Sequence, residues 1–383
     1  MAPWPTAGCE ISHSSFSSTA FGVKTAGVTT QWTFATSGSV VNPPVLGLWD
    51  TVYFTATDNT LYAADAGVGV MKWKYVSTSV PSNVGAVAVA VDGTVLVPAN
   101  RLLIALHPLT GHTLWNISLP YYITSIAVTP DTTVAAASRG YVCSLDGSIT
   151  ALTINASRAV ELWHFNMSSV DTRSDAAPAV SSALGLLYAG SANTLYCVNV
   201  SSGHLVWSFT CPGNVSRCGI YPLTASINTG SRISAVYVGT DVSLLYALDA
   251  RTGSVLWTFR TDSLAATGAG TSNELWPAAS TSTTGQLSPA VLYVGTSFST
   301  VFALDAATGV QLGQFALPGT DKARLTVSAV DMQGTVYMTS ALLQLVAADG
   351  MWSNASSAAA RSLWSFSVVT SPAIIGRNGT VYV

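Results

Sequence analysis

Short apolar runs alternate with turn residues along almost the whole chain, and the alternation itself repeats. Typical pairs of runs are residues 51–54 with 61–64, 236–239 with 245–248, and 292–295 with 301–304. Runs of this length that are rich in Val, Tyr, Leu and Phe and bounded by Gly, Asn, Asp or Ser predict β-strands. A more variable segment, often with Pro, precedes each pair and predicts a further strand.

A tryptophan marks the last strand of each repeat. The Trp-type positions recur at steps of 41 to 56 residues, and most are followed two residues later by another aromatic residue. An Asp, Asn or His lies eight residues before most of them, often with a Thr-Gly or Ser-Gly pair in between, which predicts a tight turn. Gly313 takes the Trp position in one unit. The repeat tryptophans are Trp32, Trp73, Trp115, Trp163, Trp207, Trp257 and Trp364.

Four short strands in about 47 residues, repeated around a chain, are typical of a β-propeller. We therefore expect an all-β fold, an eight-bladed β-propeller of four-stranded antiparallel blades. Residues 1–30 form a lead-in, and residues 31–383 form one propeller of seven complete repeats and a split, C-terminally truncated eighth blade. In that blade an N-terminal strand at 32–34 joins the strands at 371–375 and 380–383 and closes the ring. We expect the sequence to be a fragment, with a strand from another chain as the alternative.

The charge content excludes several classes of protein. Lys and Arg number 15, Asp and Glu 18, so that only 9% of the residues are charged and the net charge is −3. A nucleic-acid partner is not expected, because such binders need an excess of basic residues. Insertion into a membrane within this segment is not expected either, because no apolar run reaches roughly 18 residues.

The run Leu245 to Trp257, Leu-Tyr-Ala-Leu-Asp-Ala-x-Thr-Gly-x-x-x-Trp, resembles the repeat of the pyrroloquinoline-quinone-type (quinoprotein) propellers. Val301 to Gly313 matches it except at the Trp. The stretch Trp4-Pro5, Gly8, Glu10 and His13-Ser14 also resembles the start of these proteins. The resemblance implies the propeller fold, in a family that includes quinone-dependent dehydrogenases, a bacterial outer-membrane assembly lipoprotein and lumenal domains of stress-sensing kinases.

The residues favour a member without catalysis. A Ca²⁺–quinone site would need several carboxylate oxygens, but there are only three Glu, and no two Cys residues are adjacent. The five His residues show no metal-ligand spacing. We expect no catalytic residue, cofactor or metal, and of the tryptophans outside the repeat we expect Trp276, in a long loop, to be the most exposed. Seven Asp residues fall in predicted turns: Asp58, Asp65, Asp92, Asp131, Asp146, Asp249 and Asp305.

Modification signals indicate the secretory pathway. Seven Asn-x-Ser/Thr sequons lie in turns, loops or outer strands, where a glycan could project into water, although Asn and Ser also favour turns. Cys211 and Cys218 flank a short loop and are expected to form a disulfide, which suits an oxidising compartment; the pairing of Cys9, Cys143 and Cys197 stays open. The sequon residues are Asn116, Asn155, Asn166, Asn199, Asn214, Asn354 and Asn378.

The sequence thus favours a non-enzymatic secreted or cell-surface glycoprotein. Its propeller would act as a structural or interaction module with protein partners or in self-assembly, since weakly charged subunits repel each other little. The alternatives are a quinone-dependent oxidoreductase and the lumenal sensor domain of a membrane protein.

Overall fold

The structure is a computed structural model. It describes residues 29–40, 42–77, 85–134, 137–167, 178–215, 220–225, 233–261, 274–280, 291–317, 324–330, 334–340, 344–349, 362–367, 374–375 and 380–383. Within these ranges the regular structure is entirely β, as expected, and no helix has the length and apolar character to cross a membrane.

The described strands form seven antiparallel four-stranded units, which we call blades one to seven, and one two-stranded sheet. Blade one holds β1 (Val45–Leu46), β2 (Thr51–Ala56), β3 (Thr60–Asp65) and β4 (Met71–Val76). Blade two holds β5 (Ala88–Val89), β6 (Val95–Ala99), β7 (Leu102–Leu106) and β8 (Thr113–Ser118). Blade three holds β9 (Ile123–Pro130), β10 (Ser138–Ser144), β11 (Ser148–Ile154) and β12 (Ala159–Asn166). Blade four holds β13 (Ala179–Ser181), β14 (Leu186–Ser191), β15 (Thr194–Asn199) and β16 (Leu205–Thr210).

Blade five holds β17 (Ile220–Ala225), β18 (Ile233–Gly239), β19 (Leu244–Asp249) and β20 (Val255–Arg260). Blade six holds β21 (Leu275–Ser280), β22 (Val291–Thr296), β23 (Thr300–Asp305) and β24 (Gln311–Ala316). Blade seven holds β25 (Leu325–Val330), β26 (Thr335–Ser340), β27 (Gln344–Asp349) and β28 (Ser362–Ser367), and a single bridge between Thr296 and Leu325 joins it to blade six. The two-stranded sheet is β29 (Ile374–Ile375) with β30 (Val381–Tyr382).

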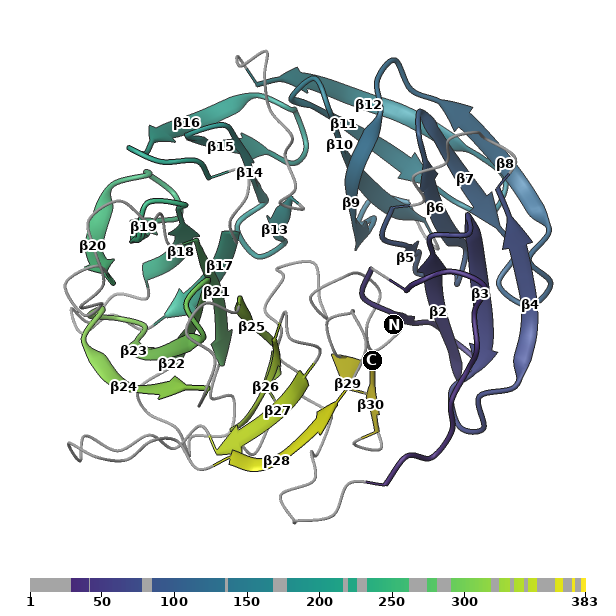
Figure 1. The fold of residues 1–383 in the computed structure, drawn as a ribbon. Helices are drawn as coiled ribbons and strands as arrows, with labels where there is room; N and C mark the ends of the chain where they lie inside the picture. The colour runs from purple at the N-terminus through teal and green to yellow at the C-terminus, as the bar shows by residue number, and fades with distance from the viewer. Residues whose placement is uncertain are drawn as a thin grey trace.

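The blades follow one another around a central axis, with the first strand of each innermost and the fourth outermost (Figure 1). We call the four strands A to D from the inside outward. Strands B and C are buried on both faces, as in β2 and β3, whereas β4 alternates between exposed and buried side chains. This explains why the B and C strands read as continuous apolar runs and the D strands as alternating ones.

A row of three side chains crosses strands B, C and D in most blades. The residue opposite the repeat Trp on strand C is always small, as with Ala247 beside Trp257, and Cys197 takes this place beside Trp207. A Tyr on strand B lies on the other side of the small residue in most blades. The Tyr and Trp rings therefore meet above it, with centroids 5.6 Å apart for Tyr237 and Trp257.

The Trp and Tyr of one blade also bind the next blade. The Trp257 indole nitrogen donates to the carbonyl of Ala306 at 3.3 Å, and the Tyr237 hydroxyl donates to the same carbonyl at 2.7 Å. The Trp257 ring lies against Gly309, whose φ of +72° and lack of a Cβ allow this contact. Trp32, Trp73, Trp115, Trp163 and Trp207 make the equivalent indole hydrogen bonds to Ala66, Pro108, Asn155, Val200 and Ala250.

A second aromatic contact ties consecutive blades. On strand D, an aromatic residue follows the Trp by two positions. On strand C of the next blade, another aromatic residue comes directly before the small residue. The two rings meet edge to face. Phe209 meets Tyr246 in this way at 5.2 Å, and Phe259 meets Phe302 at 5.5 Å. Such pairs are worth about 0.5–1.5 kcal/mol beyond the area they bury.

The two-stranded sheet lies between blades seven and one (Figure 1). Residues 32–34, predicted as an N-terminal strand, form no β-ladder with any described strand. The one ladder contact of residues 29–40 is a bridge between Val40 and Ala56. Trp32 nevertheless packs against Tyr382, with ring centroids 5.9 Å apart. This spacing lies within the range of the Tyr–Trp pairs inside the complete blades.

The small residue on strand C gives a direct test of the packing. We expect Cys197→Ala to change the free energy of unfolding by less than about 1 kcal/mol, because it keeps a small side chain under Trp207. Cys197→Leu should cost about 1–3 kcal/mol, because it forces the Tyr188 and Trp207 rings apart. Urea denaturation of the two variants measures the difference, and equal stabilities would contradict this account.

Candidate functional site

Seven carboxylates of the described residues hold turns. The Asp249 Oδ1 atom accepts the N–H groups of Arg251 and Thr252, and Asp305 does the same for Ala307 and Thr308. All seven aspartates that the sequence assigns to turns make such bonds, which confirms the prediction: Asp58, Asp65, Asp92, Asp131, Asp146, Asp249 and Asp305. The hydrogen bond from the backbone N–H of Gly67 holds the pKa of Asp65 below its usual range, although desolvation of the carboxyl acts in the opposite direction.

One buried ion pair connects blades three and four. The Asp131 carboxylate, almost fully buried, lies 3.4 Å from Nε of Arg139, whose guanidinium also donates to the carbonyl of Val200 in blade four. Burial opposes ionisation of Asp131, but hydrogen bonds from Thr133 and the charge of Arg139 still lower its pKa. Through Arg139 the pair links the A–B turn of blade three to blade four, and the Asp131 carboxylate holds Arg139 in place.

These arrangements do not fit a Ca²⁺–quinone site. One oxygen of each turn aspartate already accepts a backbone N–H group, and among the described residues no three His, Cys, Asp or Glu side chains gather into a group that could hold a metal ion. His107 and His164 bond to neighbouring Thr hydroxyls. The seven described turn aspartates therefore act as turn caps.

The three described cysteines are buried free thiols. Burial raises the pKa of Cys143, Cys197 and Cys211 to about 12, so that these thiols stay protonated and unreactive at neutral pH. Cys218 lies outside the described residues. Cys211 is unpaired in this structure, so the disulfide with Cys218 finds no support here and stays a prediction.

Several exposed apolar side chains lie in the turns at one end of the first three blades, and Val310 lies exposed in the C–D turn of blade six. Because consecutive strands are antiparallel, the A–B and C–D turns of a blade lie at the same end. Trp49, Val68, Val70 and Leu109 project from these turns with about half or more of their surface exposed. We call this set the turn-face patch; its members are Trp49, Val68, Val70, Val91, Leu109 and Val134.

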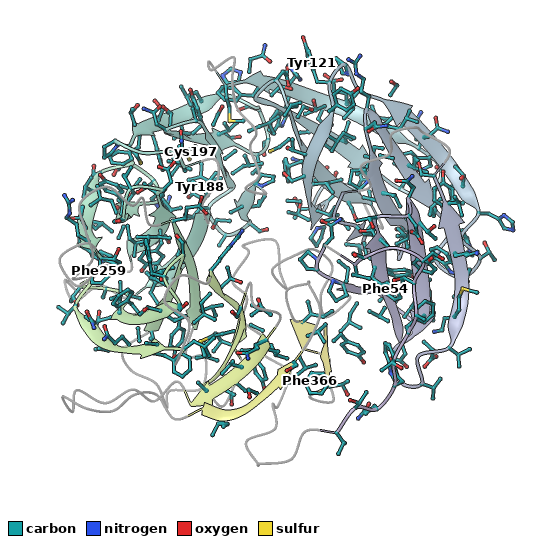
Figure 2. All side chains as sticks on the ribbon, viewed as in Figure 1. Phe54, Tyr121, Tyr188, Cys197, Phe259 and Phe366 are labelled. Carbon is teal, nitrogen blue, oxygen red and sulfur yellow. The ribbon has the colours of Figure 1, made fainter. Side chains whose placement is uncertain are left out.

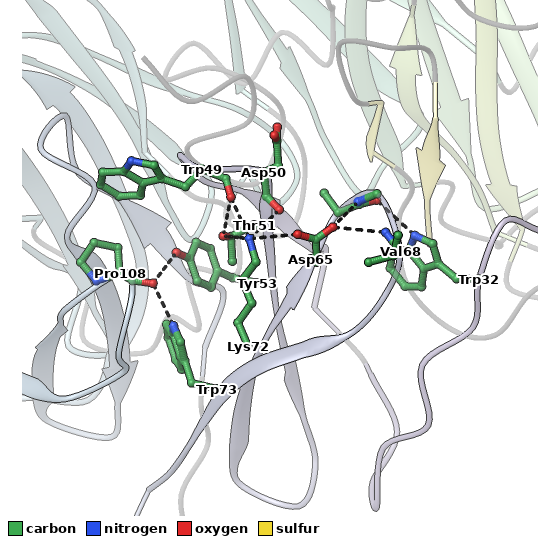
Figure 3. A network of polar contacts seen from close by, with 12 residues as sticks. Trp32, Trp49, Asp50, Thr51, Tyr53, Asp65, Val68, Lys72, Trp73 and Pro108 are labelled. Atoms are coloured by element: carbon green, nitrogen blue, oxygen red, sulfur yellow. Dashed lines mark hydrogen bonds and ion pairs between the residues drawn. The ribbon is translucent and has the colours of Figure 1, made fainter.

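The turn with Trp49 is rigidly held (Figure 3). The Lys72 ammonium donates to the carbonyls of Trp49 and Asp50 at 2.8 and 3.1 Å and pairs with Asp65 at 3.3 Å. Trp49 and Asp50 have φ values of 54° and 48°, and the edge of the Trp49 ring lies against Gly93 of blade two. Strained backbone that is fixed by its surroundings is typical of functional sites, so this turn presents Trp49 as a fixed platform.

The sequence missed this patch. It favoured Trp276 as the exposed tryptophan, but Trp276 lies on the inner strand β21 and not in a loop. Trp49 is 51% exposed. Two features of the sequence could have indicated the patch: Trp49 lies outside the repeat positions, and valines occupy neighbouring turns. Only the arrangement of the blades around the axis brings these turns to one face.

The sequons differ in how they could carry a glycan. Asn116 and Asn166 are exposed on the outer strands β8 and β12. Asn155 and Asn199 cap turns through Oδ1, which directs their amide nitrogens away from the turn backbone. The Nδ2 atom of Asn214, which would carry the glycan, instead donates to Asp241 at 2.8 Å.

The remaining two sequons, Asn354 and Asn378, lie outside the described residues. None of the seven sequons lies in the A–B or C–D turns of blades one and two. The part of the turn-face patch on blades one and two therefore holds no sequon, whereas Asn155 lies in the C–D turn of blade three, at the same end of that blade as Val134.

Comparison with known proteins gives related chains. The family model described as outer membrane protein assembly factor BamB matches residues 19–208 and 146–383. The tetrathionate hydrolase of Acidithiobacillus ferrooxidans is 25% identical over 414 residues, which cover 88% of this chain and 76% of that protein.

Two solved structures show the same fold at low identity. The quinohemoprotein alcohol dehydrogenase of Pseudomonas putida HK5 is 13% identical with a TM-score of 0.68, covering 97% of this chain and 74% of its own. BamB from Moraxella catarrhalis is 17% identical with a TM-score of 0.55, covering 83% and 85%. At these identities the likeness establishes the architecture alone.

Glycan mapping tests the sequon geometry. In protein purified from its native source we expect glycopeptides at Asn116, Asn155, Asn166 and Asn199, and a bare Asn214, because its amide is bound to Asp241. Mass spectrometry after glycosidase treatment in ¹⁸O water marks each occupied site. Bare asparagines at all four of these positions would contradict the secretory assignment, and a glycan on Asn214 would contradict the role of Asp241.

Proposed function

The chain belongs to the PQQ-type propeller family described as outer membrane protein assembly factor BamB, and from this premise we propose that it is a non-enzymatic interaction module that acts outside the cytoplasm. The proposal includes the finer architecture, a ring of eight blades in which residues 32–34 belong to the same blade as β29 and β30. It also includes secretion or display at the cell surface as a glycoprotein.

The turn-face patch is the observation that carries the proposal. Exposed apolar groups that gather on one face, on a rigid scaffold, are typical of protein interaction sites. A fixed Trp beside Val and Leu supplies the kind of anchor that dominates binding energy in interfaces. The seven turn aspartates and the three described thiols, by contrast, are held in turns or buried.

The chemistry of the surface supports a protein partner, with self-assembly as the simplest case. With a net charge of −3 on 383 residues, two copies repel each other little. The A–B and C–D turns of blades one and two hold no sequon, so the apolar groups of these turns would carry no glycan of their own. We therefore expect copies of this chain to associate through the patch.

Sedimentation velocity of the purified protein tests this interface. We expect association that increases with concentration, and we expect Val68→Ser with Val70→Ser to shift it toward the monomer by about tenfold in Kd, because polar groups replace apolar contact area. The paired substitution Leu205→Ser with Val206→Ser, on the exposed part of outer strand β16, is the matched control and should leave association unchanged. A strictly monomeric protein, or equal effects of the two pairs, would contradict the proposal.

Hydrolysis of tetrathionate is the second candidate function, because the likeness to tetrathionate hydrolase extends over most of the chain. The module proposal predicts no turnover. Purified protein incubated with tetrathionate should leave its concentration unchanged, as followed by ion chromatography over the pH range 2–8. Loss of tetrathionate that scales with protein concentration would favour the hydrolase and overturn the assignment as a non-enzyme.

A further inference from the structure

A second group of exposed apolar side chains lies at the opposite end of blades two and three. Because consecutive strands are antiparallel, the B–C turns and the D–A connections lie at the end away from the A–B and C–D turns. Tyr121 and Tyr122 lie in the connection from blade two to blade three, and Leu145 lies in the B–C turn of blade three. These side chains are 47%, 47% and 41% exposed, and Tyr121 lies at the outer edge of the ring (Figure 2). We call these three residues, with Arg101 in the B–C turn of blade two, the connection patch.

Backbone hydrogen bonds and a ring contact hold the connection patch in place. The N–H of Leu145 donates to the carbonyl of Tyr122 at 2.8 Å, and the N–H of Leu119 donates to the carbonyl of Arg101 at 2.7 Å. The Arg101 guanidinium lies over the Tyr122 ring, 5.2 Å from its centroid. The patch is therefore a fixed surface, and it combines Tyr with Arg, two residue types that often dominate binding energy in interfaces.

Arg101 is the exposed charge of the connection patch. It makes no ion pair with any residue that the structure describes, and a guanidinium stacked on a ring keeps its N–H donors for a carboxylate. Asp146, next to Leu145, is half-buried, and its Oδ1 atom accepts the N–H and the hydroxyl of Ser148. A partner surface that presents a carboxylate beside apolar groups would therefore complement this patch.

The turn-face patch has this composition. At its end of blades one and two, the turns hold the carboxylates of Asp50, Asp65 and Asp92, and β4 begins with one ammonium group, that of Lys72, which pairs with Asp65. Three carboxylates and one ammonium leave two net negative charges among the apolar side chains. The exposed Asp50 directly follows Trp49, and its carboxylate points away from Lys72 (Figure 3).

We propose that copies of this chain associate head to tail, with the turn-face patch of one copy against the connection patch of the next. This inference rests on the proposed function, because it takes association through the turn-face patch as its premise and names the surface that faces it. The apolar side chains of the two patches would lie against each other, and Asp50 would pair with Arg101 of the next copy. Each added copy presents a free patch at either end, so the assembly grows as a filament unless its rotation closes it into a ring.

The charges oppose the alternative, a head-to-head contact between two turn-face patches. Such a contact would bring Asp50 and Asp92 of one copy toward the same carboxylates of the other, and like charges across an interface are unfavourable. It would also leave Arg101 without a carboxylate. The head-to-tail contact places the negative end of one copy against the exposed guanidinium of the next, which is the complementary arrangement.

Two variants that each alter one patch test the arrangement by sedimentation velocity. Val68→Ser with Val70→Ser alters the turn-face patch, and Tyr121→Ser with Leu145→Ser alters the connection patch. We expect each variant alone to stay monomeric up to about tenfold the concentration at which the unaltered protein associates. Mixed in equal amounts, the two should form a 1:1 dimer and nothing larger, because each supplies the patch that the other lacks. All samples are first treated with glycosidase, because the sequon Asn166 lies at the same end of blade three as the connection patch.

The single substitution Arg101→Glu gives a second, independent test. We expect it to weaken association several-fold at low salt, because it places a carboxylate opposite Asp50. Association in the mixture would itself show that both paired variants are folded.

The outcomes separate this inference from the proposed function. Unchanged association of the Tyr121 and Leu145 variant, unchanged association of Arg101→Glu, or a mixture that stays monomeric while both variants keep the Tm of the unaltered protein would each overturn the head-to-tail arrangement and leave the turn-face interface in place. A monomeric unaltered protein, or no effect of the Val68 and Val70 substitutions, would instead contradict the proposed function, and this inference with it.

Discussion

The fold depends on one repeated interaction, the indole N–H of a strand-D tryptophan donating to a carbonyl of the next blade. A four-stranded sheet of about 47 residues has two apolar faces and cannot bury both alone, so each blade is stable only between neighbours. The Trp hydrogen bond fixes the angle and register of that contact, and the glycine beneath the ring lets the two backbones approach. Where Gly313 replaces the Trp, the blade relies on Phe315 and its apolar neighbours.

The same constraint explains the low charge of the chain. Strands B and C are buried on both sides, so charged residues are confined to turns, outer strands and loops. In the turns, Asp accepts backbone N–H groups through one oxygen of its carboxylate. A family fold that supports quinone-dependent dehydrogenases elsewhere thus appears here with seven described aspartates that cap turns.

The turn-face patch is not formed by the conserved positions of the internal repeat. The patch is formed by residues that deviate from the pattern, such as Trp49, and is held by contacts particular to blade one, such as the Lys72 bonds to the Trp49 turn.

The sequence by itself determined the strand periodicity, the Trp and turn positions, and the turn role of the seven aspartates, because these depend on local hydrogen bonds and on short-range spacing. It could not give the place of Trp276, the exposure of Trp49, the Asp131–Arg139 link between blades, or the bond from Asn214 to Asp241. Each of these joins residues of separate strands, turns or blades, so it exists only once the sheets are arranged around the axis. The ring also decides that turns far apart in the chain share one face, and that Trp32 meets Tyr382 across 350 residues of sequence.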